Sequence, residues 1–287
     1  MPLPVFRAEF DRDLPDRWLN INAPMLADFL VKFLQEECIR RRGIVRVVIG
    51  LSGGVDSAVS TYLAARAFGP ENTFVFRLPY SVSSQASLDH AQLIIDDLGL
   101  PARTIEITPM VDGYKDVSEP EIDATRLGNV CARTRMIILY DQSAKLRALP
   151  LGTGNKTERF FGYYTWHADD APPINPLGDL FKTQVWALAR ELGVPSVIVD
   201  KPPTADLVKG QTDEGDFGIS YIKADRILAL MLRGMSDEQI CRYDIKPEEV
   251  ALVRKKVNGT HWKRKLPTTA MISTTAINEY YLRPVDY

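Results

Sequence analysis

The most informative segment of the chain is IVRVVIGLSGGVDS, residues 44–57. It opens with a short apolar run, Ile44 to Leu51, that is rich in β-branched side chains and typical of a buried strand. Ser52–Gly53–Gly54 then ends the strand, and residues 57–68 have the pattern of a helix that stops before Gly69. The segment therefore predicts a buried strand, a tight glycine turn and a helix, in that order.

The rest of the chain repeats this alternation of strands and helices. Further strands are predicted at residues 73–78, 103–107 and 148–151, and helices at residues 26–34, 84–98, 121–146 and 179–192. The basic run Arg40–Arg41–Arg42 and Gly43 should terminate the opening helix. We expect an α/β fold, a doubly wound parallel sheet of about five strands flanked by helices, with a mostly helical C-terminal part. We expect a single domain over residues 1–287.

Ligands of such sheets bind beyond the carboxyl ends of the strands, so the loops after the first, second and fourth strands should carry the chemistry. In the first loop, Gly53 and Gly54 let the backbone approach a ligand closely, and successive N–H groups at a helix start bind anions. Ser52 and Ser57 add hydroxyl donors. A bare phosphate would repel Asp56, so its presence indicates a bridging magnesium ion.

Composition excludes several other classes of protein. The formal net charge of the 287 residues is −2, which does not suggest nucleic-acid binding. The three cysteines, Cys38, Cys131 and Cys241, form no C-x-x-C pair, which argues against a zinc or thiol redox site. The sequence shows neither a signal peptide nor 18 uninterrupted apolar residues. We expect a cytoplasmic protein without membrane contact.

The hexapeptide SGGVDS resembles the pyrophosphate-binding loop of the N-type ATP pyrophosphatases, which cleave ATP between its α and β phosphates. Four further stretches are similar to NAD synthetases in particular, and the match runs in order from about residue 25 to residue 265. These stretches are NVCARTRM (129–136), GTGNKTE (152–158), PLGDLFKTQV (176–185) and KPPTADL (201–207) followed by QTDE (211–214).

This resemblance implies roles for particular residues. Asp56 and Glu158 would share magnesium, and two carboxylates flanking a polyphosphate hold such a cation well. Lys182 would neutralise charge on the α-phosphate and the departing pyrophosphate; as a cation in the first turn of a helix it opposes the helix dipole, which favours a functional role. The implied ATP contacts are Gly50, Leu51, Ser52, Gly53, Gly54, Val55, Asp56 and Ser57, with Thr153, Lys182 and Thr204.

The implied reaction converts the nicotinate carboxylate of deamido-NAD into an amide. The carboxylate attacks the α-phosphorus of ATP, pyrophosphate leaves, and ammonia then displaces AMP from the acyl-adenylate. Fewer than 50 residues precede the first predicted strand, too few for the glutaminase domain of some relatives. Free ammonia, or ammonia from a separate glutaminase, is therefore expected, and the family resemblance also implies a homodimer.

The substrate side departs from the family pattern. Arg133 and Lys263 match residues that contact deamido-NAD, whereas Trp166 replaces a lysine, Pro173 an aspartate and Trp262 a histidine. Asp169 or Asp170 could supply the lost carboxylate, so the candidate substrate contacts are Arg133, Trp166, Asp169 and Lys263. These replacements leave open a related ligase for a different carboxylate. A tRNA-modifying adenylating enzyme and a nucleotide-binding protein without catalysis are weaker alternatives, the second because Asp56, Glu158 and Lys182 are intact.

Overall fold

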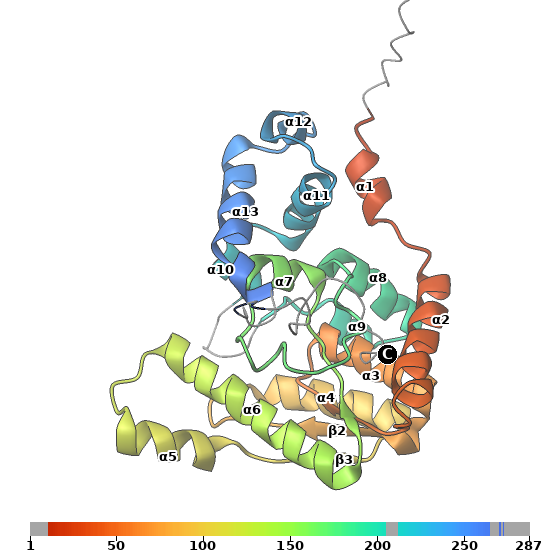
Figure 1. Ribbon diagram of the computed structural model, residues 1–287, viewed down its shortest axis with the longest axis vertical. Coiled ribbons are helices and arrows are strands. Elements are labelled where there is room, and N and C mark those ends of the chain that lie inside the picture. The colour runs from red at the N-terminus through yellow and green to blue at the C-terminus, as the bar shows by residue number, and fades with distance from the viewer. Residues whose placement is uncertain (1–10, 205–211, 265–269, 271, 273–287) are drawn as a thin grey trace, which may run out of the picture.

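The computed structural model describes residues 11–204, 212–264, 270 and 272. Figure 1 shows its arrangement of helices around a small sheet. In chain order the elements are α1 (Leu14–Leu19), α2 (Ala23–Leu34), the π-helix η1 (Gln35–Arg40), β1 (Val47–Gly50), α3 (Val55–Phe68), the short helix η2 (Pro70–Asn72), β2 (Thr73–Arg77), α4 (Gln85–Leu98), β3 (Ala102–Thr104), α5 (Thr108–Ser118), α6 (Ala124–Leu146), β4 (Leu149–Pro150), α7 (Lys156–Phe161), α8 (Lys182–Leu192), α9 (Ser196–Val199), α10 (Asp213–Phe217), α11 (Tyr221–Met231), α12 (Asp237–Cys241), α13 (Pro247–Gly259) and the short helix η3 (His261–Arg264).

The sheet is parallel throughout and has the order β3-β2-β1-β4. The predicted doubly wound sheet is confirmed, but the expected count of about five strands is too high, since the described residues form four. Beyond β4 the chain makes only a single parallel bridge, between Leu151 and Ile174. Prolines at positions 172, 173 and 176 surround Ile174, and because proline has no N–H to donate, a longer fifth strand does not form there.

Strand β1 is buried on both faces, as its apolar sequence predicts. Val47 and Ile49 face a core shared with α2, α3, α4 and α8, whereas Val48 faces a second core shared with β2 and α6. The strand is shorter than the predicted segment 44–51. Its neighbour β2 begins at Thr73, which pairs with Val47, so residues 44–46 have no partner on that side.

The helices begin and end close to their predicted bounds, with differences that have local causes. Helix α6 begins at residue 124 because the Asp123 side chain accepts a hydrogen bond from the Arg126 N–H, at 2.9 Å. The helix predicted from residue 179 begins at Lys182, where the Gln184 side chain accepts from the Phe181 N–H at 3.0 Å. The first long helix continues as η1 before the chain turns at Gly43, whose φ is +67°.

The C-terminal helices form a separate apolar core. Figure 1 shows α11, α12 and α13 grouped above α7 and α8, away from the sheet. Phe161, Phe217 and Tyr221 are buried together there with the apolar faces of α11 and α13. The prediction of a mostly helical C-terminal part is confirmed up to residue 264.

Among the described residues, every helix is too short or too polar to cross a membrane.

Candidate active site

A cavity of about 370 Å³ opens at the carboxyl ends of β1, β2 and β4, where the strand pattern places a ligand. The loop between β1 and α3 forms one wall, and the residues after β2 and β4 form two others. Of the predicted ATP contacts, all but Gly53 line this cavity: Gly50, Leu51, Ser52, Gly54, Val55, Asp56, Ser57, Thr153, Lys182 and Thr204.

Gly53 acts on the cavity indirectly, by shaping the loop. Its φ is +79°, and an added Cβ would lie 2.1 Å from the carbonyl oxygen of Ser87 in α4. The loop can therefore rest against α4 only if this residue has no side chain. Within the loop, the Ser57 hydroxyl donates to the Gly54 carbonyl at 3.0 Å and lies 3.1 Å from the Ser52 hydroxyl.

The loop leads into the N-terminus of α3, a helix of 14 residues that starts beside the cavity. Its N-cap residue is Gly54, and in the described structure no side chain caps the first turn. The first N–H groups of a helix have no partner within the helix and carry its positive dipole end. This terminus can therefore hold an anionic group in the cavity.

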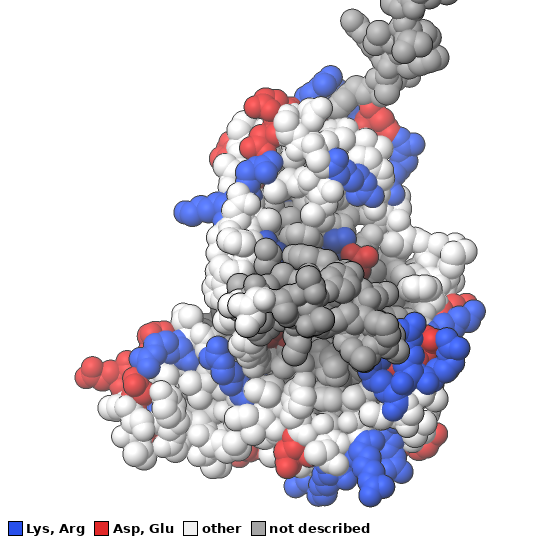
Figure 2. Space-filling view, viewed as in Figure 1, with Lys and Arg blue, Asp and Glu red and all other residues white. Residues whose placement is uncertain are grey.

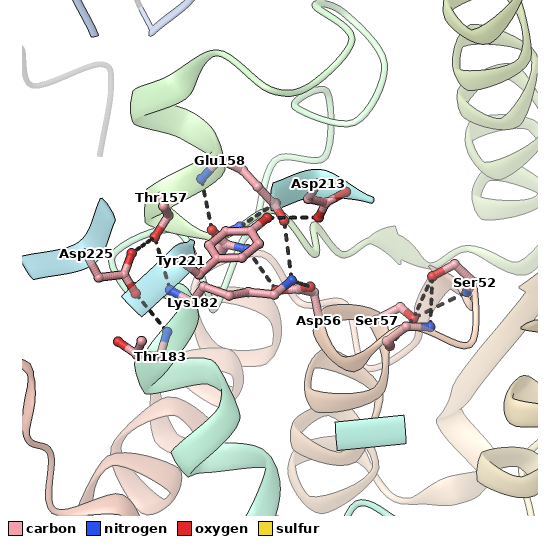
Figure 3. A network of polar contacts seen from close by, with 12 residues as sticks. Ser52, Asp56, Ser57, Thr157, Glu158, Lys182, Thr183, Asp213, Tyr221 and Asp225 are labelled. Carbon is pink, nitrogen blue, oxygen red and sulfur yellow. Dashed lines mark hydrogen bonds and ion pairs between the residues drawn. The ribbon is translucent and has the colours of Figure 1, made fainter. Parts of the chain in front are cut away.

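Asp56, Glu158 and Lys182 come from three distant parts of the chain and meet at the cavity (Figure 3). The Lys182 side chain is 3% exposed; its Nζ forms an ion pair with Asp56 and lies 3.6 Å from Glu158 Oε1. Asn155 holds both acids, because its side-chain amide donates to Asp56 at 2.9 Å and its backbone N–H donates to Glu158 at 3.2 Å. The sequence-predicted set is thus brought together by the fold.

The electrostatics of this group reflect its burial. Burial, and then the charge of Asp56, raise the pKa of Glu158 to about 8, against the attraction of Lys182. Although burial lowers the pKa of Lys182, the carboxylates of Asp56 and Glu158 raise it above its usual value. The lysine is therefore an ammonium ion at neutral pH, and its charge opposes the rise in the pKa of Glu158.

A third buried acid, Asp213 at the start of α10, was not among the predicted site residues. It lines the cavity, is 4% exposed and accepts a hydrogen bond from the Tyr221 hydroxyl at 2.9 Å. Its other carboxylate oxygen has no hydrogen-bond partner within the described part of the chain. Its place in the QTDE motif, residues 211–214, could have identified Asp213 from the sequence. With Asp56 and Glu158, it gives the cavity three carboxylates around one lysine.

The structure places one of the four predicted substrate contacts in the cavity lining. Asp169 lines the cavity, as does its neighbour Asp170, but in the described structure Arg133, Trp166 and Lys263 do not. Arg133 is on the exposed side of α6 and donates to the Trp166 carbonyl at 3.2 Å. Arg135, two residues further along the helix, lines the cavity instead and donates to the Leu78 carbonyl at 2.9 Å. Spacing alone indicates that these two arginines face different directions, but it does not say which one faces the site.

Lys263 and the tryptophans hold the loop over residues 162–170. The Lys263 ammonium donates to the carbonyls of Gly162 and Tyr164, at 2.7 and 2.8 Å. Trp166 packs edge-on against Trp262 with ring centroids 5.1 Å apart. The two replacements, Trp166 and Trp262, therefore contact each other.

A family model and two sequence relatives match most of this chain. The family model described as NAD synthase matches residues 26–267. The NH3-dependent NAD+ synthetase of Chlorobaculum parvum is 45% identical over 268 residues, which cover 92% of this chain and 96% of that protein. The corresponding protein of Trichlorobacter lovleyi is 44% identical over 270 residues, covering 94% and 98%.

Solved structures agree with the sequence relatives. The NH3-dependent NAD synthetase of Campylobacter jejuni has a TM-score of 0.75 and 32% identity, covering 88% of this chain and 100% of its own. The NMN synthetase of Francisella tularensis has a TM-score of 0.78 and 31% identity, covering 88% and 99%. The chain is thus similar over most of its length to enzymes described by both names.

We predict that Gly53→Ala destabilises the fold and weakens binding of ATP, the ligand expected here. The added methyl group would collide with the Ser87 carbonyl, and the positive φ would be strained as well. Gly43→Ala is the matched control, since Gly43 also has a positive φ but open space around it; it should lose about 1–2 kcal/mol in free energy of unfolding. Urea denaturation and ATP calorimetry measure both effects. Equal losses in the two variants, with unchanged ATP affinity, would contradict the prediction.

Proposed function

The chain belongs to the NAD synthase family, and from this membership we propose that it is an ammonia-dependent NAD synthetase, which converts the carboxylate of deamido-NAD into the amide of NAD. It is an ATP-dependent ligase that forms an amide bond, and ATP is one of its substrates. The observation that carries the proposal is the meeting of Asp56, Glu158 and Lys182 with the glycine loop in one cavity.

The chemistry requires an activated carboxylate, because ammonia does not displace oxygen from a free carboxylate. We propose that the carboxylate oxygen bonds to the α-phosphorus of ATP as the bond to the β-phosphate oxygen breaks, which gives an acyl-adenylate and pyrophosphate. Ammonia then bonds to the acyl carbon, AMP leaves with the electron pair of the broken bond, and the surplus proton of the attacking nitrogen is lost.

The described residues support these reaction steps through their charge and their position. The uncapped N-terminus of α3 and the loop around Gly54 would hold the departing pyrophosphate. The Lys182 ammonium would stabilise negative charge that develops on the phosphates. Because Lys182 is already held by two acids, its tip does not have to be reorganised when the reaction begins.

We propose that Asp56 and Glu158 hold magnesium together with the phosphates of ATP. Within the described ranges no three acidic, histidine or cysteine side chains are arranged as a metal site on their own. Magnesium usually takes one or two carboxylates and completes its shell with phosphates and water, so two acids beside a polyphosphate could hold it. Burial raises the pKa of Glu158 and of Asp213, so Lys182 does not fully compensate their charged forms, and a bound cation would stabilise those forms. When bound, the ion would neutralise charge on the phosphates.

A related carboxylate is the second candidate substrate. It is favoured by the replacements at Trp166, Pro173 and Trp262, and by the position of Arg133 and Lys263 outside the cavity lining of the described chain. Among the solved structures, the likeness to an NMN synthetase, at a TM-score of 0.78 and 31% identity, is similar to the likeness to an NAD synthetase, at 0.75 and 32%. Nicotinic acid mononucleotide, the acid that corresponds to NMN, is therefore the first alternative to assay.

We predict that ATP and ammonia yield AMP and pyrophosphate only when an acid substrate is present, and fastest with deamido-NAD. Nicotinic acid mononucleotide should support slower turnover, and glutamine in place of ammonia should support none. Pyrophosphate release measured with each acid and each nitrogen donor decides between the candidates. Faster turnover with the mononucleotide would select the second candidate, and turnover with glutamine alone would refute the dependence on ammonia.

We predict that Asp56→Asn lowers pyrophosphate release by at least about 100-fold, because it removes both a proposed magnesium ligand and the main partner of Lys182. Asp179→Asn is the matched control, since this acid also pairs with a lysine, Lys156, but its side chain is 95% exposed. Thermal melting should be recorded for both variants. Full activity in a folded Asp56→Asn protein would remove Asp56 from the reaction.

We propose that the protein is a homodimer and that α6 contributes to the interface. Arg133, Ile137 and Tyr140 are spaced to lie on one face of α6, and Ile137 is 53% exposed. An exposed apolar face beside Arg133 supports a substrate site that a second subunit helps to form.

Light scattering should give twice the 32.2 kDa of one chain. We predict that Ile137→Glu shifts the protein toward the monomer, because it places a charge on the apolar face. Ile222→Glu, at a residue of α11 that is 59% exposed, should not change the mass. A monomeric wild-type protein would overturn the proposal.

A further inference from the structure

A buried carboxylate outside the cavity connects two of the proposed catalytic residues. Asp225 in α11 is 0% exposed and does not line the cavity. Its Oδ1 accepts a hydrogen bond from the Thr157 hydroxyl at 2.6 Å, and its Oδ2 accepts one from the Thr183 backbone N–H at 2.9 Å. Figure 3 shows Asp225 directed toward these two threonines, on the opposite side of Lys182 from Ser52 and Ser57.

The two threonines are the sequence neighbours of Glu158 and Lys182. Thr157 belongs to α7, and its hydroxyl oxygen also accepts the Lys182 backbone N–H at 3.1 Å. Thr183 is the second residue of α8. One carboxylate therefore joins the backbone on which Glu158 stands to the backbone on which Lys182 stands.

This connection matters because Lys182 is held at both ends. Its ammonium lies between Asp56 and Glu158, and its backbone lies at the N-terminus of α8, where the helix dipole disfavours a cation. Asp225 places negative charge at that same terminus and accepts one of its unpaired N–H groups.

Burying the charged carboxylate of Asp225 costs free energy unless hydrogen bonds replace its lost contacts with water. Burial raises the pKa of Asp225 to about 6, and the hydrogen bonds from Thr157 and Thr183 oppose that rise. A buried carboxylate is tolerated only when it is well hydrogen-bonded, and both oxygens of Asp225 are.

We propose that Asp225 is a positioning residue that fixes the distance between Glu158 and Lys182 for the transfer of AMP to the substrate carboxylate. The proposal rests on the proposed function of the cavity. It assigns Asp225 no contact with ATP, so its loss should reduce turnover more than it reduces ATP binding.

Asp225→Asn is the direct test, because the amide keeps the shape but removes the negative charge. With its one oxygen on the Thr183 N–H, it turns an NH2 group toward Thr157, whose hydroxyl can then no longer donate its proton there. We expect kcat for pyrophosphate release to fall by about 100-fold, since a displacement of about 1 Å at a reacting group costs roughly that factor. The dissociation constant for ATP and the KM should change less than about threefold. Asp97→Asn is the matched control, an acid that also accepts a tertiary hydrogen bond, from Tyr62, but lies away from the cavity; its kcat should equal that of the wild type.

A second pair of variants covers the case in which Asp225→Asn does not fold. Thr157→Val removes the hydroxyl while keeping the shape, and Thr157→Ser restores it. The valine variant should show the same loss of kcat, and the serine variant should recover most of it. Equal kcat in these two variants, or wild-type kcat in a folded Asp225→Asn protein, overturns the proposal.

The proposed function and the positioning role of Asp225 can be tested separately. No turnover by the wild type with any nicotinate substrate would refute the proposed function by itself. Crystals of the wild type and the Asp225→Asn variant then test the positioning directly, through the distance between Lys182 Nζ and Glu158 Oε1. A longer or variable distance supports the proposal, and an unchanged distance overturns it.

Discussion

The site depends on a buried lysine that is held between two acids. Removing an ammonium ion from water costs several kcal/mol unless charged partners replace the lost hydration. Lys182 is 2% exposed and finds those partners in Asp56 and Glu158, which are separated from each other by about a hundred residues of sequence. These three residues can meet only when the loop after β1, helix α7 and helix α8 are all in place. The site therefore forms only in the correctly folded chain.

Two of the three apolar cores in the described structure, the one that holds Val47 and Ile49 and the one among the C-terminal helices, supply the rigid frame that the ion cluster needs. The first, between the sheet and helices α2, α3 and α8, fixes the strand that leads into the glycine loop. The second, formed by the C-terminal helices with α7, fixes Glu158 from the other side. Helix α8 packs against both α3 and α11, and the ring of Tyr221 in α11 lies 5.2 Å from the Lys182 ammonium. The C-terminal helices are thus part of the active-site frame.

The substrate side is built differently from the phosphate side. The phosphate side has its charges fixed by hydrogen bonds and burial. On the other side, Lys263 and the contact between Trp166 and Trp262 hold a loop in place, and Arg133 reaches the same loop from α6. The family pattern is altered at Trp166 and Trp262, whose rings contact each other.

The sequence by itself determined the order of strands and helices and the glycine loop with Asp56, because periodicity and local motifs depend on neighbouring residues. Glu158 and Lys182 were expected from the resemblance to NAD synthetases. The expected count of about five strands was too high, because beyond β4 the described chain forms only a single bridge, between Leu151 and Ile174, where the neighbouring prolines have no N–H to donate. From the family resemblance, Arg133 is expected to contact the substrate, whereas the structure places Arg135 in the cavity lining; Asp213 and Asp225 were not among the expected site residues. Only the tertiary structure decided these points, since burial and the distance between residues far apart in sequence exist only after the chain has packed.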